Sequence, residues 1–208
     1  MLMRNSTRSD AQTRGKPAGW ARVVMHAVTE DWVQDLGPNT LDVFEISGSK
    51  WANFGFRSYK NSNLSTLDIC EQAPEGQYDL IIAEQVWEHL KCPYKATKNV
   101  LAALRPGGYF LVTVPFFIRS HPHPLDCTRW SADGLRYFLE EAGFSPDAIK
   151  ADQWGNRECA VANMTGWPRY DAQFHSLKND DNFPVVAWAL ARKPAISTGD
   201  NDNSHLNS

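Results

Sequence analysis

The sequence predicts a three-layer α/β sandwich with a mostly parallel sheet, and three observations support this fold class. The run Tyr78–Ala83 is almost entirely apolar, as expected for a central strand covered on both faces. A second apolar run covers residues 109–114, and a helical pattern lies between the two. Such alternation is typical of a sheet with helices on both faces. We expect a shortened first half, because the chain from Ile46 to Tyr78 is short for two crossovers, each of which takes ~30 residues.

The first elements follow in order. Segment 17–36 has the spacing of an amphipathic helix that ends at Gly37-Pro38. Its apolar residues recur at i, i+3, i+4 and i+7: Trp20, Val23, Val24 and Ala27. Residues 41–46 are rich in β-formers and lead into Ser47-Gly48, which predicts a strand followed by a turn. We expect another short strand around residues 67–69.

The later elements are more regular. A helix should begin at Pro93 and end before Pro106-Gly107-Gly108. Ser131 should cap a further helix that ends at Gly143. Its buried stripe should contain Leu135, Phe138, Leu139 and Ala142. Residues 149–154 and 185–191 should complete the sheet as a late antiparallel pair.

Composition limits the function classes. The net charge of −3 and the scattered basic residues give no sign of a nucleic-acid partner. We expect no membrane association, because no apolar run approaches ~20 residues. We expect a cytoplasmic protein, because the start of the chain lacks the apolar part of a signal peptide and the cysteines show no paired spacing. Polar, aperiodic sequence predicts disordered tails at 1–16 and 195–208, around a single domain at 17–194.

Several motifs together resemble the class I S-adenosylmethionine-dependent methyltransferases, in the broad small-molecule, type 11-like branch with a Rossmann-like sandwich. The most specific pair is YDLIIAEQVWEHL (78–90) followed by LRPGGYFLVTVP (104–115). LDVFEISG (41–48), LDIC (67–70) and EEAGF (140–144) add to it, and PVVAWALARK (184–193) is similar to the last strand of that fold. The resemblance covers roughly residues 38–193.

The resemblance implies S-adenosyl-L-methionine as cofactor and places its binding residues. Ligands of such sheets lie beyond the carboxyl ends of the strands. By position in the motifs, the cofactor-binding residues would be Glu45, Gly48, Asp68, Glu84 and Gln85. The implied activity is methyl transfer to a small-molecule or glycan-type acceptor.

The first turn departs from the family pattern E-x-G-x-G-x-G. Here it reads Glu45-Ile46-Ser47-Gly48-Ser49-Lys50-Trp51, with one glycine, shifted by a residue, and a tryptophan at the last glycine position. Three readings stay open: a methyltransferase, a non-catalytic binding or regulatory protein on the same fold, and a nicotinamide-dependent enzyme. The missing glycines argue against the nicotinamide reading, because a pyrophosphate needs the N–H groups of that turn. Glu45 is either a cofactor ligand or a residue that only holds the N–H groups of the turn.

The loop SHPHPLDCTRW (120–130) supplies the second group of candidates. His121 and His123 are the candidate catalytic bases, because an imidazole titrates near neutral pH. Asp126 and Arg129 are candidate substrate-binding residues; alternatively, they only pair with each other to fix the loop.

We expect no metal. The alternative is a site built from His121, His123, Asp126 and Cys127, whose side chains are of suitable types. Glu88-His89 is expected to be a polar pair at a helix start rather than a catalytic dyad.

Overall fold

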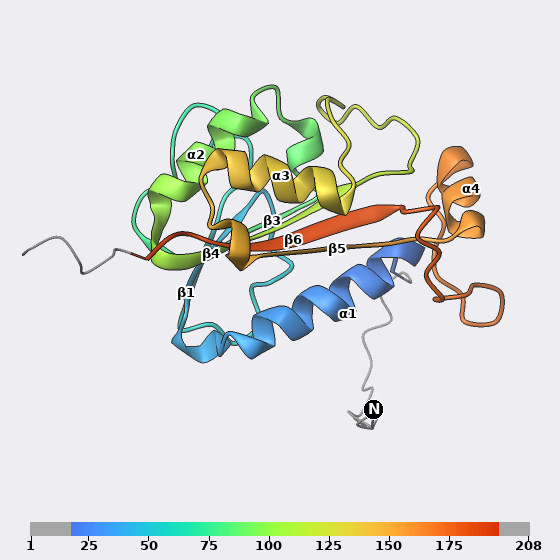
Figure 1. Ribbon diagram of the computed structural model, residues 1–208, viewed down its shortest axis with the longest axis horizontal. Coiled ribbons are helices and arrows are strands. Elements are labelled where there is room, and N and C mark those ends of the chain that lie inside the picture. The colour runs from blue at the N-terminus through green and yellow to red at the C-terminus, as the bar shows by residue number, and fades with distance from the viewer. Residues whose placement is uncertain (1–17, 196–208) are drawn as a thin grey trace, which may run out of the picture.

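The computed structural model describes residues 18–195, which form one six-stranded mixed sheet between helices (Figure 1). The strand order is β2-β1-β3-β4-β6-β5. The strands are β1 (Asp42–Ile46), β2 (Ser58–Asn61), β3 (Tyr78–Glu84), β4 (Leu104–Pro115), β5 (Ile149–Trp154) and β6 (Val186–Arg192). β2, β1, β3 and β4 run parallel, and β6 is antiparallel to both of its neighbours. The predicted sandwich and the late antiparallel pair are confirmed.

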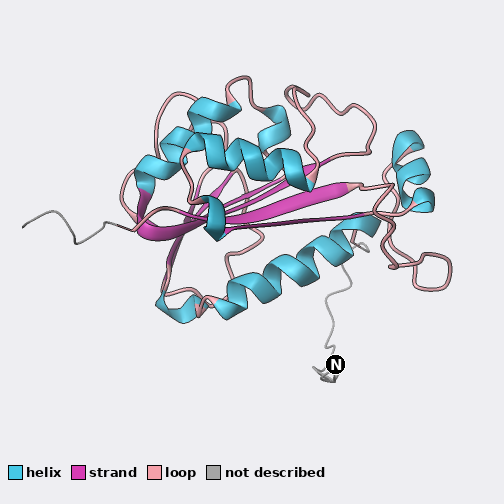
Figure 2. Cartoon of the chain, in the orientation of Figure 1, coloured by secondary structure: helices cyan, strands magenta, loops and turns pink. Residues whose placement is uncertain are grey.

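The helices form two layers on opposite faces of the sheet (Figure 2). Helix α1 (Trp20–Asp35) covers one face, while α2 (Pro93–Ala103) and α3 (Ala132–Ala142) cover the other. Helix α4 (Arg157–Thr165) lies beyond one end of the strands. Three 3₁₀ turns, Pro38–Thr40, Trp87–His89 and Pro146–Ala148, complete the regular structure. No helix within residues 18–195 is long and apolar enough to cross a membrane.

The central strands are buried on both faces because successive side chains alternate between the two helical layers. Leu80 and Ile82 of β3 pack on the α1 side, whereas Ile81 and Ala83 pack on the α2–α3 side. All four side chains are fully buried. This double burial explains why the sequence of β3 is continuously apolar.

The two long helices on the second face begin and end as their sequences predict. The hydroxyl of Ser131 accepts a hydrogen bond from the Gly134 N–H at 3.2 Å, and Gly143 ends α3 in the left-handed region with φ 109°. α2 begins at Pro93 and ends at Ala103, before Pro106-Gly107-Gly108 as predicted, but β4 begins directly at Leu104, so these three residues lie inside the strand. The chain shifts register against β3 at this point.

The first half of the sheet differs from the prediction. Residues 67–69 form no strand: a turn over residues 69–71 follows Asp68, whose carbonyl accepts the N–H groups of Glu71 and Gln72. The edge strand is β2, and neither crossover between Ile46 and Tyr78 contains a helix. The expected shortening of this half is therefore achieved by replacing both crossover helices with turns.

Two further differences concern helices. In α1, the side facing the sheet contains Met25, Thr29, Trp32 and Val33. Of the predicted stripe, Trp20 is buried and Val24 packs partly buried against the core, whereas Ala27 is exposed. α4 was not predicted. The tails predicted at 1–16 and 195–208 lie outside the described residues, apart from Ala195.

Candidate functional site

A cavity of about 430 Å³ lies beyond the carboxyl ends of β3 and β4. Gln85, directly after β3, and Pro115, the last residue of β4, form its floor. The other walls come from the start of α1, the loop after β4, α4 and the segment after α4, through Arg22, His121, Asn163 and Trp167 among others. Its position matches the rule that open α/β sheets bind ligands outside the carboxyl ends of their strands.

The turn after β1 is shaped by Glu45. This carboxylate is 1% exposed and accepts hydrogen bonds from the N–H groups of Lys50 at 3.1 Å and Trp51 at 3.0 Å, and from the Tyr59 hydroxyl at 2.6 Å. Glu45 therefore holds the N–H groups of its own turn, as the second of the two roles considered for it requires. Burial raises the pKa of Tyr59, and its hydrogen bond to the carboxylate adds to the shift.

Gly48 occupies a position in this turn where no side chain fits. A Cβ there would lie 2.2 Å from Oε1 of Glu45, which cannot move away without giving up its bond to the Lys50 N–H. Ser47, the residue before it, has φ 56°, a left-handed conformation that is unusual for a residue other than glycine. Trp51 is buried beneath the turn against Phe54, so the turn is filled from below by protein.

Asp68 lies in the chain between β2 and β3, and not at the end of a strand. It is exposed, and its carboxylate accepts the N–H of Cys70 at 2.9 Å within the turn that replaces the expected strand. Of the five predicted cofactor residues, Gln85 lines the cavity. The other four do not line it: Glu45, Gly48, Asp68 and Glu84.

Glu84 and Gln85 end β3 at the centre of the sheet. Oε1 of Glu84 contacts Nε2 of His26 at 2.9 Å and the Arg22 guanidinium at 3.3 Å, so α1 is tied to the end of the strand. These partners more than offset the effect of burial, and the pKa of Glu84 is lowered. Its second oxygen, Oε2, is buried without a hydrogen-bond partner among the described residues. Gln85 has φ 55° and hydrogen-bonds to Thr113 of β4 through both its backbone and its side chain.

Glu88, His89 and His121 form a cluster on the cavity wall, which we call the wall cluster. Glu88 is fully buried, and neither of its oxygens has a hydrogen-bond partner within residues 18–195. Burial raises its pKa to about 7. The Nε2 atoms of His89 and His121 lie 3.6 and 3.7 Å from Oε1 of Glu88, and the two rings meet edge to face.

The structure separates the two histidines predicted as bases. His121 lines the cavity with its side chain 17% exposed, and its ring also contacts Trp167. Burial lowers its pKa, and the neighbouring His89 lowers it further. His123 is exposed and does not line the cavity.

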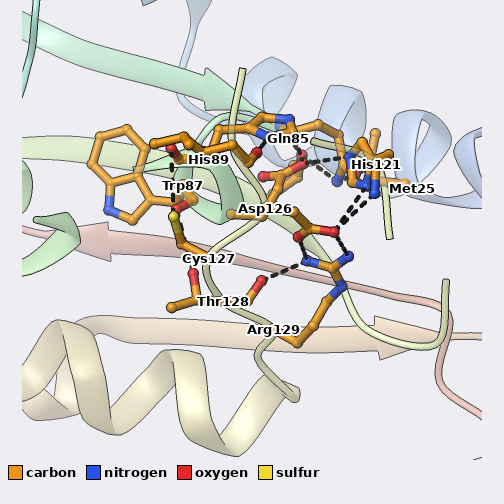
Figure 3. A network of polar contacts seen from close by, with 12 residues as sticks. Met25, Gln85, Trp87, His89, His121, Asp126, Cys127, Thr128 and Arg129 are labelled. Atoms are coloured by element: carbon orange, nitrogen blue, oxygen red, sulfur yellow. Dashed lines mark hydrogen bonds and ion pairs between the residues drawn. The ribbon is translucent and has the colours of Figure 1, made fainter. Parts of the chain in front are cut away.

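Asp126 and Arg129 pair with each other through both carboxylate oxygens (Figure 3). Asp126 also accepts the backbone N–H of His121 at 2.8 Å, so the pair fixes the loop that presents His121. The hydrogen bond from Arg129 holds the pKa of Asp126 well below its usual range. Neither residue lines the cavity, and the pairing alternative therefore describes the geometry of Asp126 and Arg129.

The segment that follows α4 contributes Trp167, Pro168 and Arg169 to the cavity wall, and its residues 166–176 are called the roof segment. It is attached to the start of α1: Trp20 donates its backbone N–H to Pro168, Tyr170 donates to Ala18, and the rings of Trp20 and His175 stack at 3.8 Å. Trp20 also donates its indole N–H to the Ser176 carbonyl at 3.1 Å.

Sequence reasoning missed the roof segment, α4 and Arg22 as parts of the site, and it underrated Glu88-His89. The available signal was the position of Glu88-His89 in the loop after β3, on the same edge of the sheet as His121. Arg22 gave no such signal, because it belongs to a helix far from the strands in sequence.

Comparisons of the chain with known proteins, by sequence and by structure, both find methyltransferases. A family model described as a methyltransferase domain matches residues 26–149, which is more than half of the chain. A probable S-adenosylmethionine-dependent methyltransferase of Mycolicibacterium smegmatis is 32% identical over 91 residues, or 41% of this chain. That match spans 34% of the length of the relative.

Solved structures share the fold at low identity. Phosphoethanolamine N-methyltransferase 2 of Haemonchus contortus, in complex with S-adenosyl-L-methionine, gives a TM-score of 0.55 at 15% identity, covering 86% of this chain and 54% of that one. The [4+2]-cyclase SpnF gives 0.53 at 16% identity, covering 86% and 87%. Because a cyclase shares the fold, the fold alone does not decide the reaction.

Proposed function

Because the chain belongs to the class I S-adenosylmethionine-dependent methyltransferase family, we propose that it transfers a methyl group from S-adenosylmethionine to a small-molecule or glycan-type acceptor. The observation that carries the proposal is the cavity beyond β3 and β4, whose volume of about 430 Å³ is in the range of small-molecule sites. Arg22 and Arg169 line it together with the wall cluster. These groups suit a polar acceptor with negatively charged or hydroxyl groups.

The residues at the ends of β1 and β3 fit the family's cofactor. Glu84 keeps a buried carboxylate oxygen without a hydrogen-bond partner among the described residues, and Gly48 lies in the turn directly after β1, at the carboxyl ends of the strands. We assign Glu84, Gln85 and the backbone around Gly48 to cofactor binding, and Asp68 to its hydroxyl or amino groups. Glu45 acts as a positioning residue, because all its hydrogen bonds hold the turn. The cofactor supplies an electrophilic methyl group bonded to sulfur.

The protein's own part is to align the acceptor, exclude water and manage the proton of the acceptor atom. Of the two predicted bases we retain His121, because it alone lines the cavity. Asp126 and Arg129 hold the backbone of His121 in place and are assigned as positioning residues.

The test is calorimetric titration of the purified protein with S-adenosylmethionine and S-adenosylhomocysteine. We expect micromolar binding by the wild type, and about tenfold weaker binding by Asp68→Asn, which keeps an oxygen for the Cys70 N–H but loses the negative charge. Glu71→Gln, which changes an exposed carboxylate three residues away, is the matched control and should bind like the wild type.

The rival is a non-catalytic binding protein on the same fold. It is favoured by the turn after β1, which Glu45 and Trp51 fill with protein contacts. Folded wild-type protein that binds neither compound would refute the proposal and favour this rival.

A further inference from the structure

We propose that the wall cluster, Glu88, His89 and His121, binds one divalent transition-metal cation at the side of the cavity. We also propose that an oxygen atom of the acceptor completes the coordination of that cation; this second part rests on the proposed function. The argument uses the burial of Glu88, the spacing of the three side chains and the contacts behind each histidine.

The first argument is the state of Glu88. A fully buried carboxylate without hydrogen bonds is costly, and native proteins normally give such a group a partner. The nearest candidates are the two imidazoles, and their Nε2 atoms, at 3.6 and 3.7 Å from Oε1, are too far away for hydrogen bonds. A cation between the three groups would provide the missing partner.

The second argument is the spacing. Nitrogen and oxygen ligands bind zinc at ~2.1 Å, so two ligands of one tetrahedral ion lie roughly 3.4 Å apart. The ligand atoms of the wall cluster all lie within 4.8 Å of one another, and both carboxylate–imidazole distances are within a few tenths of an ångström of that value. Small side-chain movements would therefore complete the site.

The third argument is the outer contacts of the histidines. Nδ1 of His89 lies 2.5 Å from the Leu125 carbonyl, whereas Nδ1 of His121 has no hydrogen-bond partner within residues 18–195 and faces the Asp126 carboxylate at 3.8 Å. A hydrogen bond from one ring nitrogen is the usual arrangement for histidines that bind metal through the other nitrogen, and His89 has this arrangement. In both residues that other nitrogen, Nε2, is the one near Glu88.

Neighbouring charges do not oppose the cation strongly. Arg129 is paired with Asp126, and Arg22 is paired with Glu84. Two imidazoles and one carboxylate favour ions such as Zn²⁺, Mn²⁺, Fe²⁺ or Co²⁺ over Ca²⁺, which prefers oxygen ligands throughout. Three protein ligands leave positions free on the cavity side, where a hydroxyl or carboxylate oxygen can bind.

The ligand set differs from the alternative considered for the loop. Asp126 is committed to Arg129 and His123 is exposed, whereas Glu88 and His89 come from the corner after β3. With a cation bound, Nε2 of His121 is a ligand and does not serve as the base; the cation would instead lower the pKa of an acceptor hydroxyl bound to it.

The first experiment is titration of tag-free, chelator-treated protein with Co²⁺, followed by calorimetry and by visible absorption, which reports the ligands of cobalt. We expect one ion per chain with micromolar affinity, and about 100-fold weaker binding in Glu88→Gln and His89→Ala. Glu88→Gln removes a buried, unpartnered charge, so its thermal unfolding temperature without metal should not fall. His123→Ala is the matched control and should bind Co²⁺ like the wild type.

Three results would overturn the metal site: no Co²⁺ or Zn²⁺ binding by folded wild type up to about 1 mM, unchanged binding in Glu88→Gln, or equal loss in His123→Ala. Catechol and lactate then probe the second part, since either should change the cobalt spectrum by adding oxygen ligands. An unchanged spectrum with both would overturn the second part. Because Co²⁺ binding is read without S-adenosylmethionine, failure of the metal site and failure of the proposed function are distinguishable.

Discussion

Glu45 illustrates how one buried carboxylate can determine the shape of a turn. Its oxygens accept two backbone N–H groups and one phenol hydroxyl, which are contributed by the turn itself and by the edge strand β2. It also excludes any side chain larger than glycine at position 48. The carboxylate thus fixes the backbone of the turn directly.

Glu45→Ala should lower the free energy of unfolding by about 3 kcal/mol, because two backbone N–H groups lose their acceptor and one of them is buried. Tyr59→Phe removes only one of the three hydrogen bonds and should cost about 1 kcal/mol. Urea unfolding of the two variants and the wild type measures both values. An Ala variant no less stable than the Phe variant would show that water replaces the carboxylate in the turn.

At the scale of elements, α4 and the chain after it are joined through Asn156. The side-chain oxygen of Asn156 caps α4 by accepting the Cys159 N–H at 2.9 Å, while its amide donates to the carbonyls of Ser176 and Lys178. One residue therefore begins a helix and anchors the end of the roof segment.

Asn156→Ala should lower the free energy of unfolding by about 2 kcal/mol, since it loses both the cap and the two donated bonds. Asn156→Ser keeps an oxygen for the cap and should cost about 1 kcal/mol. Both variants should be cut faster by protease between residues 170 and 178 than the wild type. Equal cleavage rates in all three proteins would mean that other contacts hold this segment.

Whether the sequence alone predicts a helix or strand depends on how the side chains of that element are buried. β3 and α3 are predictable, since double burial gives a continuous apolar run and single-sided burial gives a stripe. β2 carries mostly exposed polar residues, and α4 has no clear apolar face, so their positions depend on contacts made elsewhere in the fold. For the same reason, His121 could be named from the loop, but its neighbours from α1 and the roof segment could not.

At the scale of the whole molecule, the cavity and a network of charged residues lie at opposite ends of the strands. The cavity lies at the carboxyl edge, and the amino edge carries a network of charges that joins β1, β3 and β4. Asp42 contacts Arg57 at 2.6 Å and Arg105 at 2.9 Å, and Arg105 also contacts Asp79 at 2.8 Å. The hydrogen bond from Arg57 holds the pKa of Asp42 well below its usual range.

Because the pKa of Asp42 is lowered by folding, its contribution to stability is present above the unfolded-state value of about 4 and is lost as the pH falls further. The wild type should therefore be more stable than Asp42→Asn at pH ~6, and the difference should narrow at pH ~3. Urea unfolding of both proteins at the two pH values measures this difference in stability. High salt should also reduce the difference in stability between the two proteins at pH ~6, since these groups are near solvent. A stability difference that does not change with pH would mean that the substitution acts through packing and not through charge.

The joint between the roof segment and the start of α1 has a practical meaning for protein engineering. Trp20 stacks on His175 and donates hydrogen bonds to Pro168 and Ser176, so the two pieces form one interface although they are distant in sequence. A graft that exchanges residues 166–176 for those of another family member would remove the His175 ring from Trp20 and would have to keep the two acceptor carbonyls in place. On the proposed function, the unit to exchange for altered acceptor binding is therefore the roof segment together with the first turn of α1, while the sheet and the turn after β1 stay in place.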